Sequence, residues 1–273
     1  MKPVFSIIVV SKNEGIGLRN TIDSILKQDF LSYEIVLIDS CSTDGSTNFL
    51  NEINISNILF ISEKDRGIYD GMNKGIKYSS GNYIYFLNAG DTFHDEKVLM
   101  NASIFIKSEP SLIIGNILLI GTETKAVESH PFRKHLIFYP GFNHQRIFHH
   151  KRLFEEFGLY NLEFKVAADR EFLFKVFNSV KDDIKYLDIT LAKFFLGGLS
   201  SSPKTQKLAI HEQLLLFKKY FNRLERLSFI LFFNFDPDWP NPKSFYVKLL
   251  NLSFIKSLRF SFQKPISKLL GWV

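Results

Sequence analysis

Three aspartates of this 273-residue chain stand where a carboxylate can do chemistry. Asp39 and Asp91 each follow a short apolar run and lie among small residues, whereas Asp169 precedes a run with helical spacing. A carboxylate at a strand end can accept hydrogen bonds from a base or a ribose, and one beside glycine can approach a hard divalent cation. At Asp169 the pattern leaves two interpretations open, a helix cap and a general base.

Polar residues gather around these aspartates. Residues 11–14 read Ser-Lys-Asn-Glu after the first apolar run, residues 39–46 form a polar stretch after the second, and residues 88–91 read Asn-Ala-Gly-Asp. A lone histidine, His144, lies upstream of Asp169. Such a histidine is more often structural than functional, so residue chemistry alone assigns it no role.

The spacing of apolar residues predicts the elements that carry these clusters. We expect strands at 4–10, 34–38, 58–61 and 83–87, with helices at 15–28, 44–51, 67–79 and from a cap at Asp95 to about 106. Strand and helix thus alternate four times, which favours an α/β fold with an open, mostly parallel, twisted sheet flanked by helices. Ligands of such sheets lie at the carboxyl ends of the strands, so the polar clusters should share one crevice.

Beyond the fourth strand the pattern is less regular. We expect strands at 112–115, 117–120 and 184–188, helices at 154–157, 170–177, 205–233 and 244–270, and a hinge at 197–203. These elements predict a first domain at 1–203, with one half at 1–115 and the other at 116–203. A helical, basic extension covers 204–273.

Several classes of protein are excluded or disfavoured by composition. The single cysteine, Cys41, excludes a disulfide framework and a cysteine-based zinc site, and it fits a cytoplasmic protein. The sequence contains no run of about 18 apolar residues, so we expect no membrane-spanning helix. The first apolar run is too short for a signal peptide. The stretch at 15–20 lacks the third glycine of a dinucleotide fingerprint, which disfavours an oxidoreductase.

The net charge of +6 is unevenly distributed. Residues 205–273 hold 11 of the 34 basic residues but only 4 of the 28 acidic ones, so the rest of the chain is nearly neutral. The segment 243–273 has six basic residues, no acidic residue and an apolar stripe at helical spacing. Such a segment suits an anionic membrane surface, here the inner face of the cytoplasmic membrane, although a solvated face of a packed helix fits as well. We expect no nucleic-acid partner.

Four segments together resemble the family 2 glycosyltransferases of the GT-A fold, and look most like bacterial members that build polysaccharides. They read Val-Ser-Lys-Asn-Glu at 10–14, Leu-Ile-Asp-Ser-Cys-Ser-Thr-Asp-Gly-Ser at 37–46, Asp-Arg-Gly-Ile-Tyr-Asp-Gly-Met-Asn-Lys-Gly at 65–75 and Phe-Leu-Asn-Ala-Gly-Asp at 86–91. The resemblance covers about residues 3–200. It implies inverting transfer of a sugar from a nucleoside-diphosphate sugar, with UDP as the most frequent nucleotide, to a glycan or lipid-linked acceptor.

The resemblance also implies roles for individual residues. By position, the nucleoside-binding loops are matched by Ser11, Asn13, Glu14 and Asp39. The donor-contacting segment is matched by Asp65 and Arg66, with Asn73 and Lys74 nearby. Asp91 matches the last carboxylate of the metal-binding Asp-x-Asp motif, which implies Mg²⁺ or Mn²⁺ as the cofactor, with His144 as a second candidate ligand. Asp169 matches the general base.

Two departures from the family pattern leave alternatives open. The usual Asp-x-Asp motif reads Asn88/Ala89-Gly90-Asp91 here, so Asp91 is a lone carboxylate, and Ala168 replaces the acidic residue that precedes the base. The weakened motif is the best support for a non-catalytic relative that binds nucleotide sugars. A nucleotidyltransferase would need a basic, glycine-rich phosphate loop, whereas residues 11–17 carry only one lysine.

Overall fold

The computed structural model describes residues 2–52, 56–121, 125–127, 137, 144–196, 203–223 and 225. One sheet contains the strands β1 (Phe5–Ser11), β2 (Tyr33–Asp39), β3 (Ile58–Ser62), β4 (Tyr83–Phe86), β5 (Thr92–Phe93), β6 (Leu112–Ile120), β7 (Lys125–Val127), β8 (Ile147–His150) and β9 (Ile184–Phe195). The helices are α1 (Ile16–Leu26), α2 (Ile68–Tyr78), α3 (Val98–Ser103), α4 (Arg152–Phe157), α5 (Ala168–Val180) and α6 (Pro203–Tyr220), with 3-10 turns η1 (Asn48–Asn51), η2 (Ile106–Ser108) and η4 (His144–Arg146).

The strand order is β3-β2-β1-β4-β8-β6-β9-β5, with β7 paired to β6. Strands β1 to β4 are parallel to one another, as are β6 and β9, whereas β8 is antiparallel to both of its neighbours. Ser11 at the end of β1 lies opposite Asp39 at the end of β2. The expected α/β sheet is therefore confirmed, and its parallel strands bring the predicted polar loops to one edge.

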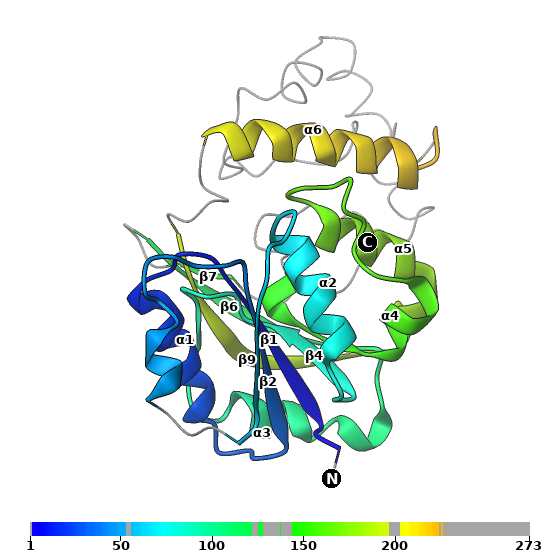
Figure 1. Cartoon of the computed structure of the whole chain (residues 1–273). Helices are drawn as coiled ribbons and strands as arrows, with labels where there is room; N and C mark the ends of the chain where they lie inside the picture. The colour runs from blue at the N-terminus through cyan, green and yellow to red at the C-terminus, as the bar shows by residue number, and fades with distance from the viewer. Residues whose placement is uncertain are drawn as a thin grey trace. The chain divides into compact units, whose positions relative to one another are not determined.

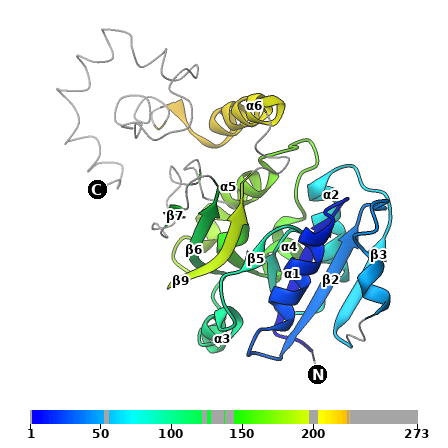
Figure 2. The same cartoon turned by 90° about the vertical axis from the view of Figure 1, so that its left-hand side faces the viewer.

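Helices cover both faces of this sheet. Figure 1 shows α1 and α3 on one side and α2, α4 and α5 on the other, and Figure 2 shows the twist of the strands between them. Strand β1 is buried along its whole length, as expected for a central parallel strand. Phe5, Ile7 and Val9 join the apolar core that includes α1, while the alternate residues Ile8 and Val10 face α2.

Helix α2 lies very close to β1. A Cβ atom on Gly71 would lie 2.7 Å from a methyl group of Val10, and one on Gly75 would overlap Ile8. The two glycines are four residues apart and so lie on the same face of the helix. Their lack of side chains lets the helix backbone approach the sheet directly, which determines where the other side chains of α2 lie.

The structure corrects several sequence-based boundaries. Helix α3 begins at Val98, without a side-chain cap, and ends at Ser103. Asp95 instead accepts a hydrogen bond from the backbone N–H of Lys97, outside the helix, so its predicted capping role was wrong. The two strands expected at 112–115 and 117–120 form the single strand β6, whose pairing with β9 shifts register around Asn116.

The C-terminal part of the chain is only partly described. The described chain separates into two compact units, residues 1–210 and 211–273. The predicted hinge at 197–203 lies almost entirely outside the described residues, and so do most of the predicted helix beyond 220 and the whole basic segment 243–273. Within the described part of the chain, no helix combines the length and apolar character needed to span a membrane. Membrane docking of segment 243–273 stays a prediction.

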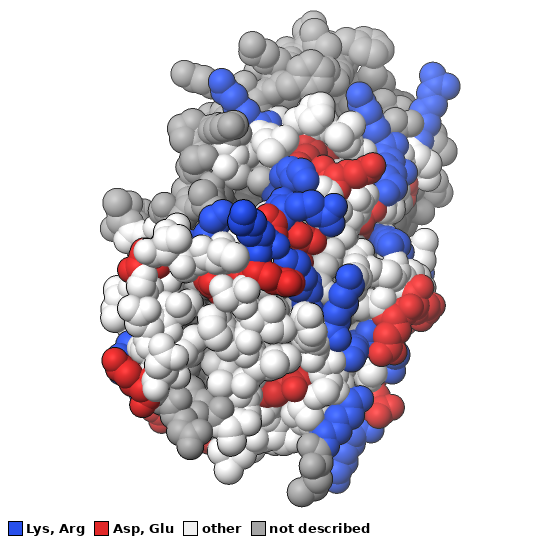
Figure 3. All heavy atoms as spheres, in the orientation of Figure 1, with Lys and Arg blue, Asp and Glu red and all other residues white. Residues whose placement is uncertain are grey.

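Charges of both signs lie side by side on the described surface seen in Figure 3. The described ion pairs include Lys74–Glu63, at 3.0 Å, and Arg66–Asp70, at 3.4 Å. Each pair has one well-exposed partner, Glu63 or Arg66, and ion pairs open to solvent add little to stability, so these two matter mainly for the segments that they connect.

The close approach of α2 to β1 predicts that Gly75→Ala destabilises the fold. The added methyl group overlaps Ile8 at the core of the sheet, and overpacking of this kind costs about 1–3 kcal/mol, which exceeds the gain of about 1 kcal/mol in helix propensity. Chemical denaturation measures the change. Lys77→Ala, at an exposed position of the same helix, is the control and should stay within about 0.5 kcal/mol of wild type. A Gly75→Ala variant as stable as that control would contradict the packing argument.

Candidate active site

The loops after β1 and β2 are connected to each other by hydrogen bonds. The backbone N–H of Asn13 donates to the Ser42 hydroxyl at 2.8 Å, and the backbone N–H of Thr43 donates to Asn13 Oδ1 at 2.8 Å. Gly15 N–H donates to the Asp44 carboxylate at 2.9 Å. These bonds keep Asn13 in a left-handed conformation, with φ 54°. The two predicted nucleoside loops therefore form one surface.

Asp39 is buried at the base of this surface. Its carboxylate accepts hydrogen bonds from the Ser42 hydroxyl, the Ser42 backbone N–H at 2.9 Å and the Ser62 hydroxyl at 2.7 Å. Next to it, the Ser11 hydroxyl oxygen is buried without a partner in the described structure. Asp39 thus organises the loop that follows it, while the hydroxyl of Ser11 beside it keeps an unused hydrogen-bonding capacity.

The turn at residues 88–91 joins the same edge of the sheet through α1. Ala89 N–H donates to the carbonyl of Val10, and Gly90 N–H donates to Thr21 Oγ1, which itself donates to the carbonyl of Asp91 at 2.6 Å. Gly90 has φ 97°, a conformation that L side chains rarely adopt. The geometry of this turn therefore suits a glycine at residue 90.

Asp91 is buried and hydrogen-bonded to neutral donors. One carboxylate oxygen accepts the backbone N–H of Phe195 at 2.9 Å and the other accepts the side-chain amide of Gln145. Burial raises the pKa of Asp91 to about 7, despite these hydrogen bonds. Such an electrostatic environment favours the approach of a cation, because the carboxylate has little compensation for its charge.

Asp169 lies in the first turn of α5 and is buried as well. Its Oδ1 accepts the hydroxyl of Tyr69, from α2, at 2.9 Å, and its Oδ2 lies 3.3 Å from His144 Nδ1. Burial alone raises the pKa of this carboxyl, but His144, the charge of Arg170 and Tyr69 outweigh it and hold the pKa below the ordinary value. Asp169 is therefore ionised at neutral pH.

The turn η4 connects the two carboxylates. His144 Nε2 lies 3.0 Å from the side-chain nitrogen of Asn88, so with Asn88 as donor the imidazole presents Nδ1–H to Asp169. The next residue, Gln145, holds Asp91, and its carbonyl accepts the hydroxyl of Tyr85 at 2.6 Å. Both ring nitrogens of His144 are thus engaged. This arrangement favours a role for His144 beside Asp169 over the predicted role as a metal ligand.

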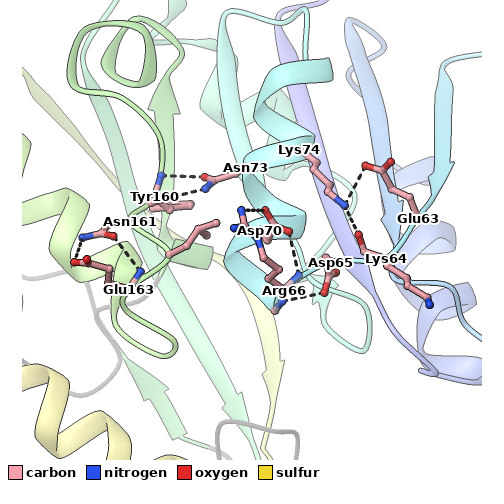
Figure 4. Close-up of polar contacts among 12 residues, drawn as sticks. Glu63, Lys64, Asp65, Arg66, Asp70, Asn73, Lys74, Tyr160, Asn161 and Glu163 are labelled. Atoms are coloured by element: carbon pink, nitrogen blue, oxygen red, sulfur yellow. Dashed lines mark hydrogen bonds and ion pairs between the residues drawn. The ribbon is translucent and has the colours of Figure 1, made fainter.

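The donor-contacting segment predicted from the sequence precedes α2 and is held by that helix (Figure 4). Asp70 accepts the backbone N–H of Arg66 at 3.0 Å and the Arg66 guanidinium at 3.4 Å. Lys74 bridges Glu63, at 3.0 Å, and the carbonyl of Lys64, at 2.6 Å. The Arg66 side chain is 75% exposed, so its cationic group remains accessible to an anionic ligand.

Asn73 points away from that segment. Its side-chain nitrogen donates to the carbonyl of Tyr160 at 2.9 Å, and its oxygen accepts the backbone N–H of Tyr160 at 2.9 Å. Asn73 is buried, and Figure 4 shows it directed toward Tyr160. These contacts favour a structural task in place of the donor contact predicted for it.

The described residues suit a cation held by few protein ligands. They include no group of three histidine, cysteine or acidic side chains able to hold a metal ion. Asp91 nevertheless retains lone pairs that its two hydrogen bonds do not use, and the buried side-chain oxygen of Asn88 lacks a partner in the described structure. Oxygen donors of this type fit Mg²⁺ or Mn²⁺, whose remaining ligands would come from a diphosphate and water.

Two residues of this site were not assigned a role from the sequence. Tyr69 donates to Asp169, and Gln145 donates to Asp91. Tyr69 lies within the recognisable segment 65–75, and Gln145 directly follows the candidate His144, so each stood beside a noted motif. Their importance depends on contacts between residues 100 and 54 positions apart, which spacing along the chain does not reveal.

The fold is that of the GT-A transferases. The chain matches Staphylococcus aureus TarS 1-349, solved with UDP-GlcNAc, with a TM-score of 0.66 and 18% identity, covering 84% of this chain and 70% of that one. It matches the Pyrobaculum calidifontis mannosyltransferase PcManGT, solved with GDP-Man and Mn²⁺, with a TM-score of 0.58 and 14% identity, over 100% of this chain and 79% of that one.

Residues 6–167 match the family model described as glycosyl transferase family 2, and the chain belongs to that family. A Mycobacterium tuberculosis PGL/p-HBAD biosynthesis glycosyltransferase is 32% identical over 206 residues, which cover 73% of this chain and 80% of the relative. The Escherichia coli UDP-Glc:alpha-D-GlcNAc-diphosphoundecaprenol beta-1,3-glucosyltransferase WfgD is 31% identical over 120 residues, 44% of this chain and 47% of that protein. This chain is therefore a glycosyltransferase related to enzymes of glycolipid and polysaccharide biosynthesis.

The contacts of Asp169 predict that Tyr69→Phe raises the pKa of this carboxyl. The variant removes a hydroxyl that donates to the carboxylate, and it leaves the burial that disfavours the charged form. Carbon-13 NMR titration of the aspartate carboxyls measures the shift. Tyr160→Phe is the matched control, because the Tyr160 hydroxyl is buried nearby without a partner in the described structure. Equal pKa values in wild type and Tyr69→Phe would show that the hydrogen bond does not stabilise the ionised form.

Proposed function

We propose that this chain catalyses an inverting transfer of a sugar from a nucleoside-diphosphate sugar to a hydroxyl group of a glycan or lipid-linked acceptor, in the synthesis of a bacterial surface polysaccharide or glycolipid. The observation that carries the proposal is the pair of buried carboxylates, Asp91 and Asp169, connected through His144 and Gln145. Asp91 is suited to binding a cation, and Asp169 is suited to accepting a proton.

Asp169 is the proposed general base. It is ionised at neutral pH and oriented from both sides, by Tyr69 and by His144, so it is ready to accept a proton. Asp169 would take the proton from the acceptor hydroxyl while that oxygen forms a bond to the anomeric carbon. The bond from this carbon to the diphosphate oxygen breaks on the opposite face, and a single displacement of this kind inverts the configuration.

The donor is proposed to lie over the loops at the ends of β1 and β2. Two groups of residues are assigned to the donor. The joined loops contribute Ser11, Asn13, Glu14 and Asp39. The segment before α2 and the helix itself contribute Asp65, Arg66 and Lys74. Support comes from the unpartnered hydroxyl of Ser11 and the accessible guanidinium of Arg66, which offer a hydrogen bond and a positive charge. UDP is the proposed nucleotide, because TarS was solved with UDP-GlcNAc and WfgD is named for UDP-Glc.

Asp91, with the side-chain oxygen of Asn88, would hold Mg²⁺ or Mn²⁺ against the donor diphosphate. A bound divalent cation neutralises the charge that develops on the leaving diphosphate. PcManGT, a structural neighbour, was solved with Mn²⁺ and GDP-Man, which supports a cation in this fold. The acceptor class rests on relatives whose names refer to glycolipid biosynthesis and to a diphosphoundecaprenol substrate.

The role of Asp169 predicts that Asp169→Asn lowers turnover by about 10²–10⁴-fold, the usual contribution of a general base. The amide cannot accept the proton, but it preserves the shape of the side chain, so donor affinity should change little. UDP release from UDP-glucose and UDP-N-acetylglucosamine measures turnover, and calorimetry with UDP and Mn²⁺ measures affinity. Asp23→Asn, an exposed aspartate of α1, is the matched control and should keep wild-type turnover. Near-normal turnover of Asp169→Asn would remove this residue from catalysis.

The role of Asp91 predicts that Asp91→Asn weakens the binding of UDP with Mn²⁺ and leaves the fold intact. The substitution removes the charge, whereas rotation of the Gln145 amide by half a turn lets its oxygen accept from the new amide, so the buried contact survives. Calorimetry compares UDP affinity with and without Mn²⁺. The exposed Asp95, four residues along, provides the control Asp95→Asn. An unchanged gain in affinity from Mn²⁺ would exclude Asp91 as the cation ligand.

A further inference from the structure

We propose that Asn73 is a positioning residue for the transfer reaction. Its side chain clamps the backbone of Tyr160, the ring of Tyr160 packs against Tyr69, and Tyr69 in turn holds the base Asp169 in place. The proposal rests on the role assigned to Asp169 above. It gives Asn73 a task in the acceptor half of the site, although the residue lies in a segment predicted to contact the donor.

The clamp consists of two hydrogen bonds that run in opposite directions. The side-chain amide of Asn73 donates to the carbonyl of Tyr160 and accepts its backbone N–H, each at 2.9 Å. Both residues are buried, so these backbone groups have no access to water that could replace the amide. Two bonds to one residue define its orientation as well as its position.

The ring of Tyr160 carries this restraint to Tyr69. The centroids of the two rings are 5.4 Å apart, in an edge-to-face arrangement. Tyr160 also packs against Phe86, Phe154 and Phe172. The Tyr160 hydroxyl has no hydrogen-bond partner in the described structure. Packing and the backbone clamp therefore hold this residue, and no bond to its hydroxyl contributes.

Helix geometry places both contacts on one face of α2. Tyr69 and Asn73 are four residues apart and so lie one turn from each other. Tyr69 donates to Asp169 and Asn73 binds Tyr160, so the helix contacts the segment that leads to the base at two successive points. A shift of this segment would move the hydroxyl of Tyr69 and the carboxylate of Asp169 relative to each other.

The contacts of neighbouring residues separate this role from donor binding. Asp70 and Lys74 connect α2 to the segment at 63–66, whereas the amide of Asn73 is directed to the other side (Figure 4). Loss of the Asn73 amide should therefore affect the chemical step and not the binding of the nucleotide.

The test compares Asn73→Ala with Asn161→Ala, the adjacent asparagine of the clamped segment, whose side-chain bonds stay within that segment. Turnover is followed as UDP release from UDP-glucose and UDP-N-acetylglucosamine. We expect Asn73→Ala to lose about 10–100-fold in kcat, the cost of a misplaced reacting group, with the Kd for UDP and Mn²⁺ within about twofold of wild type. Asn161→Ala should keep its turnover within about twofold. An unchanged kcat, or a loss of UDP affinity as large as the loss of turnover, would overturn the proposal.

A double-mutant cycle tests the route through Tyr69. If Asn73 acts through this residue, Tyr69→Phe combined with Asn73→Ala should be no more than about twofold slower than the slower single variant. Independent, multiplicative losses would overturn the route. A wrong general-base assignment would be recognised separately. In that case Asp169→Asn would keep its turnover, whatever the turnover of the Asn73→Ala variant.

Amide hydrogen exchange provides a readout that does not depend on turnover. Asn73→Ala removes the acceptor of the Tyr160 N–H, so exchange at this amide should become faster, while Asn161→Ala leaves it unchanged. Unchanged exchange in Asn73→Ala would overturn the clamp. If that variant does not fold, Asn73→Asp replaces it, because a carboxylate still accepts the Tyr160 N–H but cannot donate to the carbonyl. It should lose turnover while its Tyr160 amide stays protected.

Discussion

The site depends on how closely α2 approaches β1. Gly71 and Gly75 lie against Val10 and Ile8, and the absence of their side chains sets the distance between the helix and the sheet. Because the helix is rigid, this distance also determines how far its other side chains reach. Tyr69 and Asn73 then contact Asp169 and Tyr160, and Lys74 contacts the segment before the helix. One packing constraint thus positions both groups of contacts.

The two buried carboxylates of the site differ because their partners differ. Asp169 has a histidine, a tyrosine hydroxyl and the charge of Arg170 around it, and together they overcome the cost of burial. At Asp91, burial outweighs the backbone N–H of Phe195, the charge of His144 and the amide of Gln145, and the charge of Glu14 adds to the effect of burial, so the pKa rises. Divergent environments of paired carboxylates commonly separate an acid–base role from an electrostatic one. The shared element is η4, which contributes one residue to each carboxylate.

The sequence predicted the fold and the strand ends well, because both depend on local periodicity. Apolar spacing located β1 to β4, and the parallel order of these strands explains why Asp39 and Asp91 belong to one site. Contacts such as Asn73 with Tyr160, which join positions 87 residues apart, depend on tertiary packing and were not predictable. Asp95 shows the opposite failure, because a local sequence signal was present but gave a wrong prediction. Its residue type predicted a helix cap, whereas α3 begins at Val98 and Asp95 accepts the backbone N–H of Lys97 outside the helix.

The turn that carries Asp91 disfavours a second carboxylate beside it. Gly90 has φ 97°, and the site of its missing Cβ lies 3.4 Å from the Glu14 carboxylate, so an acidic side chain there would combine backbone strain with like-charge repulsion. Residue 90 is therefore suited to glycine, and Asp91 is the one carboxylate of the turn. A single buried charge attracts a divalent cation less strongly than two would. We therefore infer that the diphosphate of the donor supplies the missing negative charge, and that cation and nucleotide bind together.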